Sequence, residues 1–273
     1  MQAIRAWTPP TGTLGGIVSE AHERARVLAA REQDLIRAAA AAPAVPAFDA
    51  ALRRQTVALI AEVKRRSPSK GWINPTLSAA QQALAYQTGG AAAVSVLTEP
   101  LHFGGSNDDL ESVRAAVGIP ILKKDFHVSP VQLIEAKAIG ASAALVITRA
   151  VAPDALIELL RTAREVQLEV LVEVRDDEEL ARALAAGARI IGINNRNLET
   201  LEIDPSTSER LLARLPRDVV AIAESGVSSR ADIERVAACG ADGVLVGSAI
   251  SAAADPVAGV RALIGVPRVE RDA

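Results

Sequence analysis

Charged side chains stand where an apolar segment of this chain would be expected to end in a plain turn. The first case is AEVKRRSPSKG, residues 61–71, which follows an apolar run and places Glu62 two residues before Lys64. Side chains alternate across a β-strand, so Glu62 and Lys64 share one face. A carboxylate and an ammonium on one face can bind a polar substrate and exchange protons with it, or they can form a purely structural ion pair. The other segments of the chain favour the first interpretation.

The same pattern recurs along the chain. Short apolar segments rich in Val, Ile, Leu and Ala span residues 56–63, 91–98, 120–125, 143–148, 168–174, 189–194, 219–225 and 242–248. Near-continuous apolarity over this length is typical of parallel strands that are covered on both faces. Polar residues at or just beyond their ends include Lys124, Glu173, Asn194, Arg196, Glu224, Ser225 and Ser248. One charge at a strand end is ordinarily a solvated loop residue, but repetition over most strands indicates a shared polar site.

Helical patterns separate these segments and define the fold class. Residues 130–140 and 153–165, for example, carry apolar residues at a spacing of three to four and begin with proline. Eight strands that alternate with helices predict an α/β fold, a (β/α)8 TIM barrel, in which the carboxyl ends of the strands carry the chemistry. An open doubly wound sheet is the alternative, although no G-x-G-x-x-G motif opens its first turn.

One more amphipathic helix, roughly Ile17 to Ala40, precedes the first strand, and we expect it to cap part of the barrel. We expect a single barrel domain over residues 1–273. Within it, the N-terminal helical extension occupies about 1–50 and the barrel about 56–265.

Composition excludes several classes of partner. The net charge is −3 and the pI about 5.8, without a basic stripe for a nucleic-acid backbone. No apolar run approaches the roughly 20 residues that span a bilayer, and no secretory signal is evident. The single cysteine, Cys239, has no partner for a disulfide, and the three histidines lack metal-ligand spacing. We therefore expect a cytoplasmic protein without a metal site.

Two further features indicate the parts of a substrate. Glu224-Ser225-Gly226 and Gly247-Ser248 lie at the ends of the seventh and eighth segments, where many such barrels bind a phosphate through backbone N–H groups. The chain has only three phenylalanines, and Phe103 and Phe126 lie near the expected mouth of the barrel. With Pro68 as a possible further wall, they suggest an apolar slot for a planar ring.

Seven motifs, in order, resemble the indole-3-glycerol phosphate synthase family. They are AEVKRRSPSKG (61–71), SVLTEPLHFGGS (95–106), ILKKDF (121–126), LVEV (171–174), IGINNRNLET (191–200), AESG (223–226) and VLVGSAI (244–250). The resemblance covers nearly the whole chain, including the extra N-terminal helix. It implies ring closure of a phosphorylated carboxyphenylamino sugar in tryptophan biosynthesis, with loss of carbon dioxide and water and with no cofactor.

The resemblance also implies roles for individual residues. Lys124 matches the general acid, Glu173 the general base, and Lys64 a lysine that binds substrate and takes part in later acid chemistry. The residues implied to contact the substrate are Glu62, Ser67, Phe103, Asn194, Arg196, Glu224 and Ser225. Those implied to cradle the phosphate are Gly226, Gly247 and Ser248. Phe126 joins the substrate contacts because it shares a face with Lys124.

Acid catalysis by Lys124 requires a proton that leaves near neutral pH. We expect burial and the positive charge of Lys64 to lower the pKa of Lys124 from its usual value near 10.4. The neighbouring Lys123 alternates to the other face of the strand, and we expect it to extend its ammonium outward to solvent.

Two other functions are compatible with a phosphate-binding barrel. One is phosphoribosylanthranilate isomerase, but that enzyme needs a Cys/Asp pair, and Cys239 lies far from a strand end. The other is a non-catalytic phospho-ligand-binding barrel, which would be expected to lose its catalytic lysines. We expect a monomer whose partner is a small phosphorylated substrate.

Overall fold

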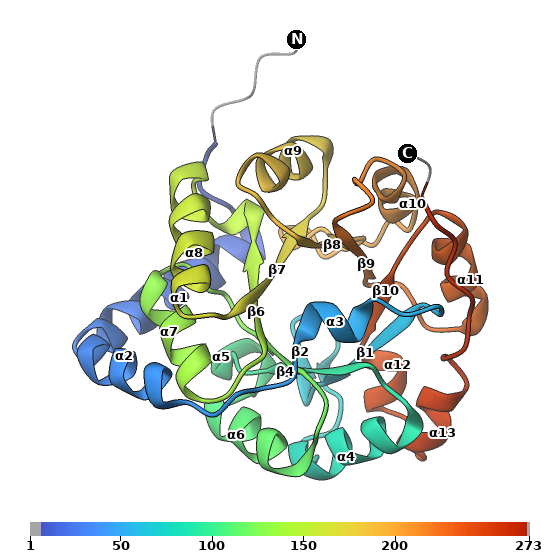
Figure 1. Cartoon of the computed structure of the whole chain (residues 1–273), viewed down its shortest axis with the longest axis horizontal. Coiled ribbons are helices and arrows are strands. Elements are labelled where there is room, and N and C mark those ends of the chain that lie inside the picture. The colour runs from blue at the N-terminus through green and yellow to red at the C-terminus, as the bar shows by residue number, and fades with distance from the viewer. Residues whose placement is uncertain (1–6, 272–273) are drawn as a thin grey trace.

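The apolar segments form parallel strands that close into a barrel, in the computed structural model, which describes residues 7–271 (Figure 1). In order around the barrel the strands are β1, β10, β9, β8, β7, β6, β5 and β4. Their bounds are β1 (Ala58–Val63), β4 (Ala93–Leu97), β5 (Ile121–Lys124), β6 (Ala143–Ile147), β7 (Glu169–Val174), β8 (Ile190–Asn194), β9 (Val220–Glu224) and β10 (Gly243–Val246). The predicted (β/α)8 fold class is confirmed.

Helices surround the barrel, and several of them begin at a residue that caps free N–H groups. Those that return the chain to the next strand are α4 (Ala79–Gly89), α6 (Asn107–Ala116), α7 (Pro130–Ala138), α8 (Pro153–Glu165), α9 (Asp177–Ala185), α10 (Ser206–Leu212) and α11 (Arg230–Ala238), and α13 (Pro256–Arg261) follows the last strand. The side chain of Ser106, for example, accepts from the Asp109 N–H and so begins α6. None of the helices of the described residues is long and apolar enough to cross a membrane.

Shorter elements shape the loops at the carboxyl ends of the strands. An antiparallel pair, β2 (Arg66–Ser67) and β3 (Gly71–Trp72), follows β1. The helices α5 (Pro100–Phe103) and α12 (Ser248–Ser251) follow β4 and β10, and the 3-10 turn η1 (Thr148–Ala150) follows β6. These short elements border the mouth of the barrel.

The N-terminal extension differs from the prediction of one helix over residues 17–40. It contains α1 (Gly12–Ala29) and α2 (Glu32–Ala41), and Arg31 between them has a non-helical ψ of 11°. The buried side chains of α1 include Leu14 and Ile17, which belong to the barrel core, whereas Leu35 of α2 packs with Ile134 of α7. Ala25 of α1 belongs to this second cluster as well, so α1 and α2 meet there on either side of the turn at Arg31.

The helix α3 (Phe48–Leu52) covers the amino-terminal end of the barrel. Phe48 and Leu52 are fully buried there. The carboxylate of Glu169, the first residue of β7, accepts from the N–H groups of Phe48 and Asp49, at 2.5 and 2.9 Å. Because α3 covers the amino-terminal end, a ligand would have to enter the barrel at the opposite end, where the strands have their carboxyl ends.

Candidate active site

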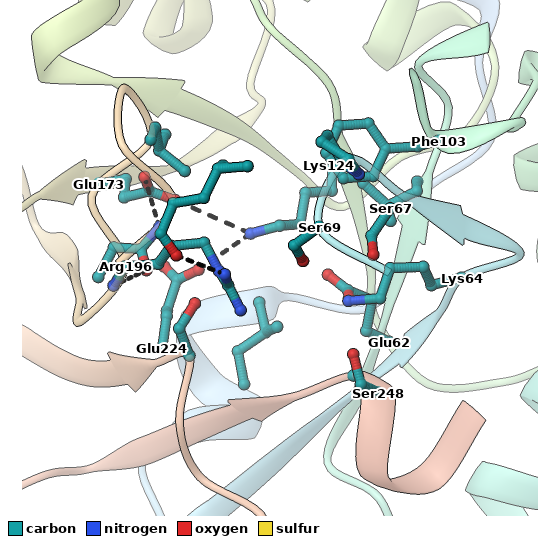
Figure 2. A pocket seen from close by; sticks show the side chains of 18 of the residues that line it. Glu62, Lys64, Ser67, Ser69, Phe103, Lys124, Glu173, Arg196, Glu224 and Ser248 are labelled. Carbon is teal, nitrogen blue, oxygen red and sulfur yellow. Dashed lines mark hydrogen bonds and ion pairs between the residues drawn. The ribbon is translucent and has the colours of Figure 1, made fainter. Parts of the chain in front are cut away.

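A cavity of about 350 Å³ opens at the carboxyl ends of the strands. The structure brings every predicted site residue to its wall: Glu62, Lys64, Ser67, Phe103, Lys124, Phe126, Glu173, Asn194, Arg196, Glu224, Ser225, Gly226, Gly247 and Ser248. Pro68 lies there too. Figure 2 shows that the side chains it labels, such as Glu173 and Lys64, come from opposite sides of the barrel and point toward one space. Their roles in catalysis stay predictions, but their proximity is a property of the fold.

Lys124, at the end of β5, lies among carboxylates (Figure 2). Its Nζ donates to Glu224 Oε2 at 3.0 Å and lies 3.8 Å from Glu173 Oε2. Burial alone would lower the pKa of Lys124, but attraction to Glu224, Glu173 and Glu62 outweighs it and raises the pKa. The expectation that Lys64 and burial would lower this pKa is therefore wrong. Sequence spacing did not show that three carboxylates would converge on one ammonium.

Glu173, on β7, has the opposite electrostatic setting. It is buried, and Asn194 Nδ2 donates to its Oε1 at 2.9 Å. Burial raises its pKa to about 7, and repulsion from Glu224 adds to the effect, while Lys124 opposes it. A carboxylate with a pKa near neutrality can accept a proton and return it during one reaction cycle.

The Glu62–Lys64 pair is the ion pair that the first motif suggested. Lys64 Nζ lies 2.5 Å from Glu62 Oε1. Burial would raise the pKa of Glu62, but attraction to Lys64 and Lys124 lowers it, so the carboxylate stays ionised. A Cβ at Gly247 would stand 2.2 Å from Glu62 Oε1 and 2.8 Å from Lys64 Nζ. Gly247 therefore leaves room for this pair at its observed place, in addition to its predicted role at a phosphate.

Gly192, within β8, is a site residue that the sequence reasoning missed. A Cβ there would stand 2.0 Å from Glu224 Oε1, so only glycine admits the Glu224 carboxylate at its observed place. The one available signal was a glycine inside a strand, which often marks a close approach. Helix α1 also contributes Leu14 and Ile17 to the cavity wall, which the sequence analysis assigned only to a cap.

The two phenylalanines form one face of the cavity. Their ring centroids are 6.2 Å apart, and the planes are tilted by 37°. Phe103 comes from α5 and Phe126 from the loop after β5. This separation is within the range for favourable aromatic contact, and both side chains line the cavity.

The segments predicted to hold a phosphate lie across the cavity from the phenylalanines. Ser225 and Gly226, after β9, have φ angles of 60° and 77°, so the backbone turns sharply there. Gly247 and Ser248 follow β10 and begin α12. Small residues in such turns leave backbone groups open to an anion.

Two residues outside the mouth were also the subject of predictions. Lys123 does point away from Lys124, but it does not reach solvent: it is 2% exposed and pairs with Glu135 Oε2 of α7 at 2.7 Å. Its helix-side partner could not be identified from strand alternation alone. Cys239 ends α11 and packs against the core, away from the mouth.

Comparison with known proteins gives a consistent result. The family model described as indole-3-glycerol phosphate synthase matches residues 16–263. Among relatives named indole-3-glycerol phosphate synthase, that of Mycolicibacterium gilvum is 49% identical, over 82% of this chain and 82% of its own length. That of Rhodococcus jostii is 48% identical, over 87% and 90%. Indole-3-glycerol phosphate synthase 2 of Streptomyces coelicolor is 46% identical, over 93% of this chain and 100% of its own.

A solved structure, thiamine phosphate pyrophosphorylase from Pyrococcus furiosus, superposes with a TM-score of 0.59 at 16% identity. The match covers 76% of this chain and 93% of that chain. At this identity the likeness shows the barrel fold alone.

Proposed function

This chain belongs to the indole-3-glycerol phosphate synthase family, and on that premise we propose how its barrel mouth performs the reaction. The substrate is 1-(2-carboxyphenylamino)-1-deoxyribulose 5-phosphate, and the products are indole-3-glycerol phosphate, carbon dioxide and water. One observation carries the division of roles: an ammonium, Lys124, lies within about 4 Å of two buried carboxylates, Glu173 and Glu224, in one cavity.

Lys124 supplies the proton for ring closure. As the ring carbon attacks the ketone, negative charge develops on the ketone oxygen, and a fixed ammonium stabilises it. The raised pKa of Lys124 keeps it charged before the reaction. Transfer remains favourable because the alkoxide that forms is a stronger base than an amine. Glu224 and Glu173 hold the ammonium in place.

Glu173 acts as the base in the later dehydration. Loss of carbon dioxide and then of a hydroxyl group requires that one proton leave the ring as another is delivered to the departing oxygen. A carboxylate with a pKa of about 7 is suited to accept the first. Asn194 fixes its orientation. Lys64 lies in the same cavity and is the second ammonium available to deliver a proton to the departing hydroxyl.

The shape of the cavity orders the three parts of the substrate. The phosphate binds at Ser225, Gly226, Gly247 and Ser248, and the carboxyphenyl ring lies against Phe103 and Phe126. The sugar chain between them meets Glu62 and Asn194, while Ser67 and Arg196 complete the wall. Fixing both ends folds a flexible substrate toward the reacting geometry, which lowers the entropic part of the barrier.

We further propose that the enzyme works as a cytoplasmic monomer. The support is that residues of one chain supply the lysines, the carboxylates and the expected phosphate site. Size-exclusion chromatography with light scattering tests the oligomeric state, and an obligate dimer would contradict it.

Turnover of the carboxyphenylamino-deoxyribulose phosphate tests the function directly. The purified protein should produce indole fluorescence, and the product should be identified by mass. The alternative, a non-catalytic phospho-ligand-binding barrel, predicts saturable binding of the same compound with no indole product. Binding without turnover by the intact protein would therefore reject the synthase.

A further inference from the structure

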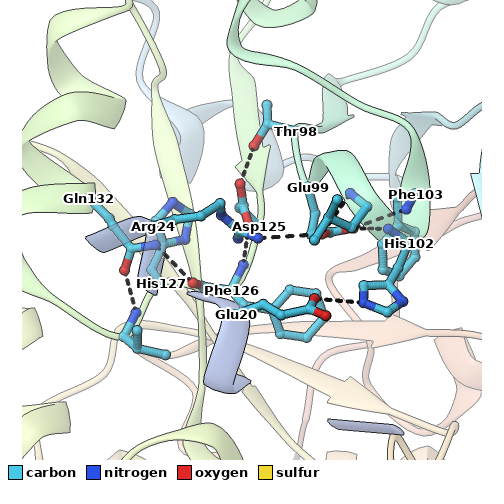
Figure 3. Close-up of polar contacts among 12 residues, drawn as sticks. Glu20, Arg24, Thr98, Glu99, His102, Phe103, Asp125, Phe126, His127 and Gln132 are labelled. Carbon is cyan, nitrogen blue, oxygen red and sulfur yellow. Dashed lines mark hydrogen bonds and ion pairs between the residues drawn. The ribbon is translucent and has the colours of Figure 1, made fainter. Parts of the chain in front are cut away.

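Arg24, on α1, joins two loops of the mouth without lining the cavity. Its Nη2 lies 2.6 Å from Asp125 Oδ1, and its Nη1 lies 3.4 Å from Glu99 Oε1 (Figure 3). Glu99 follows β4, and Asp125 follows β5. Both carboxylates are largely withdrawn from water: the Glu99 side chain is 0% exposed and that of Asp125 10%. A guanidinium is planar and donates in two directions, so one side chain can hold both.

Each of these carboxylates in turn holds the backbone of one phenylalanine. Glu99 caps α5 by accepting from the N–H groups of Leu101, His102 and Phe103. Asp125 Oδ1 accepts from the Phe126 N–H at 2.8 Å, and Thr98 Oγ1 donates to its other oxygen. The two phenylalanines of the ring slot are thus each one hydrogen bond from a carboxylate, and both carboxylates contact Arg24 (Figure 3).

Two alternative roles for the cluster are less well supported. The first is a metal site, because Glu20, Glu99 and His102 have ligand atoms within 4.8 Å of one another. However, the Glu99 carboxylate already accepts from three backbone N–H groups, and His102 Nε2 lies 2.7 Å from Glu20 Oε2. The second is a purely structural link between α1 and the barrel, and it predicts equal effects on every ligand.

We propose that Arg24 is a positioning residue that sets the separation of Phe103 and Phe126, and so the affinity of the site for the aromatic ring of its ligands. It acts through Glu99 and Asp125 and touches no substrate itself. This inference rests on the proposed function, because it takes the phenylalanine slot as the place of the substrate ring. The phosphate end of the cavity is formed by segments after β9 and β10, on other strands than those that carry this cluster.

The test compares a ligand that carries the ring with one that lacks it. For Arg24→Ala, the inhibition constant of indole-3-glycerol phosphate should rise about tenfold or more, since small displacements in a preorganised site cost up to about a hundredfold. That of glycerol 3-phosphate should change less than about twofold, because the phosphate end is held by other strands. Arg24→Lys, which keeps the charge but loses the planar fork, should fall between the alanine variant and the native protein.

Matched controls separate positioning from folding. Arg26→Ala removes another arginine of α1, whose pair with Glu23 is exposed, and should leave both constants unchanged. In a Phe103→Ala background, Arg24→Ala should add little to the loss of ring affinity, because the slot is already open. If Arg24→Ala does not fold, Asp125→Asn, which keeps the shape of the side chain, should show the same selective loss.

An equal loss for both ligands, or no loss for either, would overturn the inference. These outcomes are distinguishable from failure of the proposed function, because the latter is measured as indole formation by the native protein. When turnover is absent, the two constants become dissociation constants measured by calorimetry, and the comparison stands.

Discussion

Both ends of the barrel bury carboxylates, but the two ends differ in how completely these carboxylates are provided with ionic and hydrogen-bond partners. At the amino-terminal end, Asp242 precedes β10 and receives Arg268 on one oxygen and Arg271 on the other, each at 2.9 Å. The Ala221 N–H of β9 adds a third contact at 2.8 Å. At the mouth, Glu224 Oε1 is buried and lacks a hydrogen-bond partner among the described residues.

This difference separates charged groups that stabilise the fold from charged groups to which we assign the proposed reaction. Asp242 has partners on both of its oxygens, so the arrangement is complete without a ligand. The carboxylates around Lys124 repel one another, and that repulsion contributes to the pKa of about 7 at Glu173. A cluster of incompletely paired carboxylates destabilises the fold when no ligand is bound, and a bound substrate can relieve that destabilisation by supplying the missing hydrogen-bond donors. Mutations of the mouth carboxylates should therefore reduce activity without loss of stability, whereas mutations at the amino-terminal end should reduce stability without loss of activity.

The largest effect is expected for Lys124→Ala. Removing the ammonium that contacts both Glu173 and Glu224 should reduce kcat by about a thousandfold or more, since it removes both the acid and its electrostatic stabilisation. Affinity for indole-3-glycerol phosphate should remain within about tenfold of the native value, because the phosphate and ring contacts persist. Steady-state turnover followed by indole fluorescence, with product inhibition, measures both quantities.

Lys123→Ala is the neighbouring control for that prediction. Lys123 pairs with Glu135 on the helix side of β5, so its loss should lower the Tm and leave kcat within a few-fold. If Lys123→Ala abolished turnover and Lys124→Ala did not, the assignment of the acid would be reversed.

Glu173→Gln should reduce kcat by about a hundredfold, because the amide keeps the shape but cannot take a proton. Because Glu173 acts after carbon dioxide has left, its ionisation should appear in kcat, which should rise with pH through about 7 for the native enzyme. Lys124 should remain protonated over this range, because its pKa is raised above the usual lysine value. The variant should lack the inflection near 7, and an unchanged inflection would assign it to another group.

Asp242→Asn should weaken the fold without affecting catalysis. It leaves Arg271, which is 8% exposed, without its buried ionic partner, and breaking such a pair costs about 3 kcal/mol. For a chain of this size the Tm should fall by roughly 5–10 °C. Arg189→Ala, which breaks an exposed pair with Asp218, is the matched control and should change stability by less than about 1 kcal/mol. A large loss of kcat in Asp242→Asn at room temperature would contradict the separation of the two ends.

Strand alternation explains why so much of the mouth could be predicted from sequence. Glu62 and Lys64 had to share a face, and Lys124 had to point opposite to Lys123, once both segments were strands. Alternation within one strand does not show which residues of other strands lie nearby. The contact of Glu224 with Lys124 and the space that Gly192 leaves for Glu224 arise only when the eight strands close into a barrel, so they could not be predicted from the sequence. The turn at Arg31 between α1 and α2 is marked by no glycine or proline in the sequence, so apolar spacing alone predicted one helix.

The smallest effect we expect is the most specific to the mouth: Glu173→Gln should stabilise the protein. The pKa of Glu173 is about 7 when folded, against a usual value of 4.5, so its contribution to stability is fully present below 4.5 and is lost as pH rises through 7. Glutamine does not titrate. At about pH 8 the variant should therefore be more stable than the native protein, by about 1–2 kcal/mol and with a higher Tm, and the difference should shrink toward about pH 5. If the Tm of Glu173→Gln instead fell below that of the native protein at about pH 8, as we expect for Asp242→Asn, the buried carboxylates at the mouth would be as fully paired as those at the opposite end.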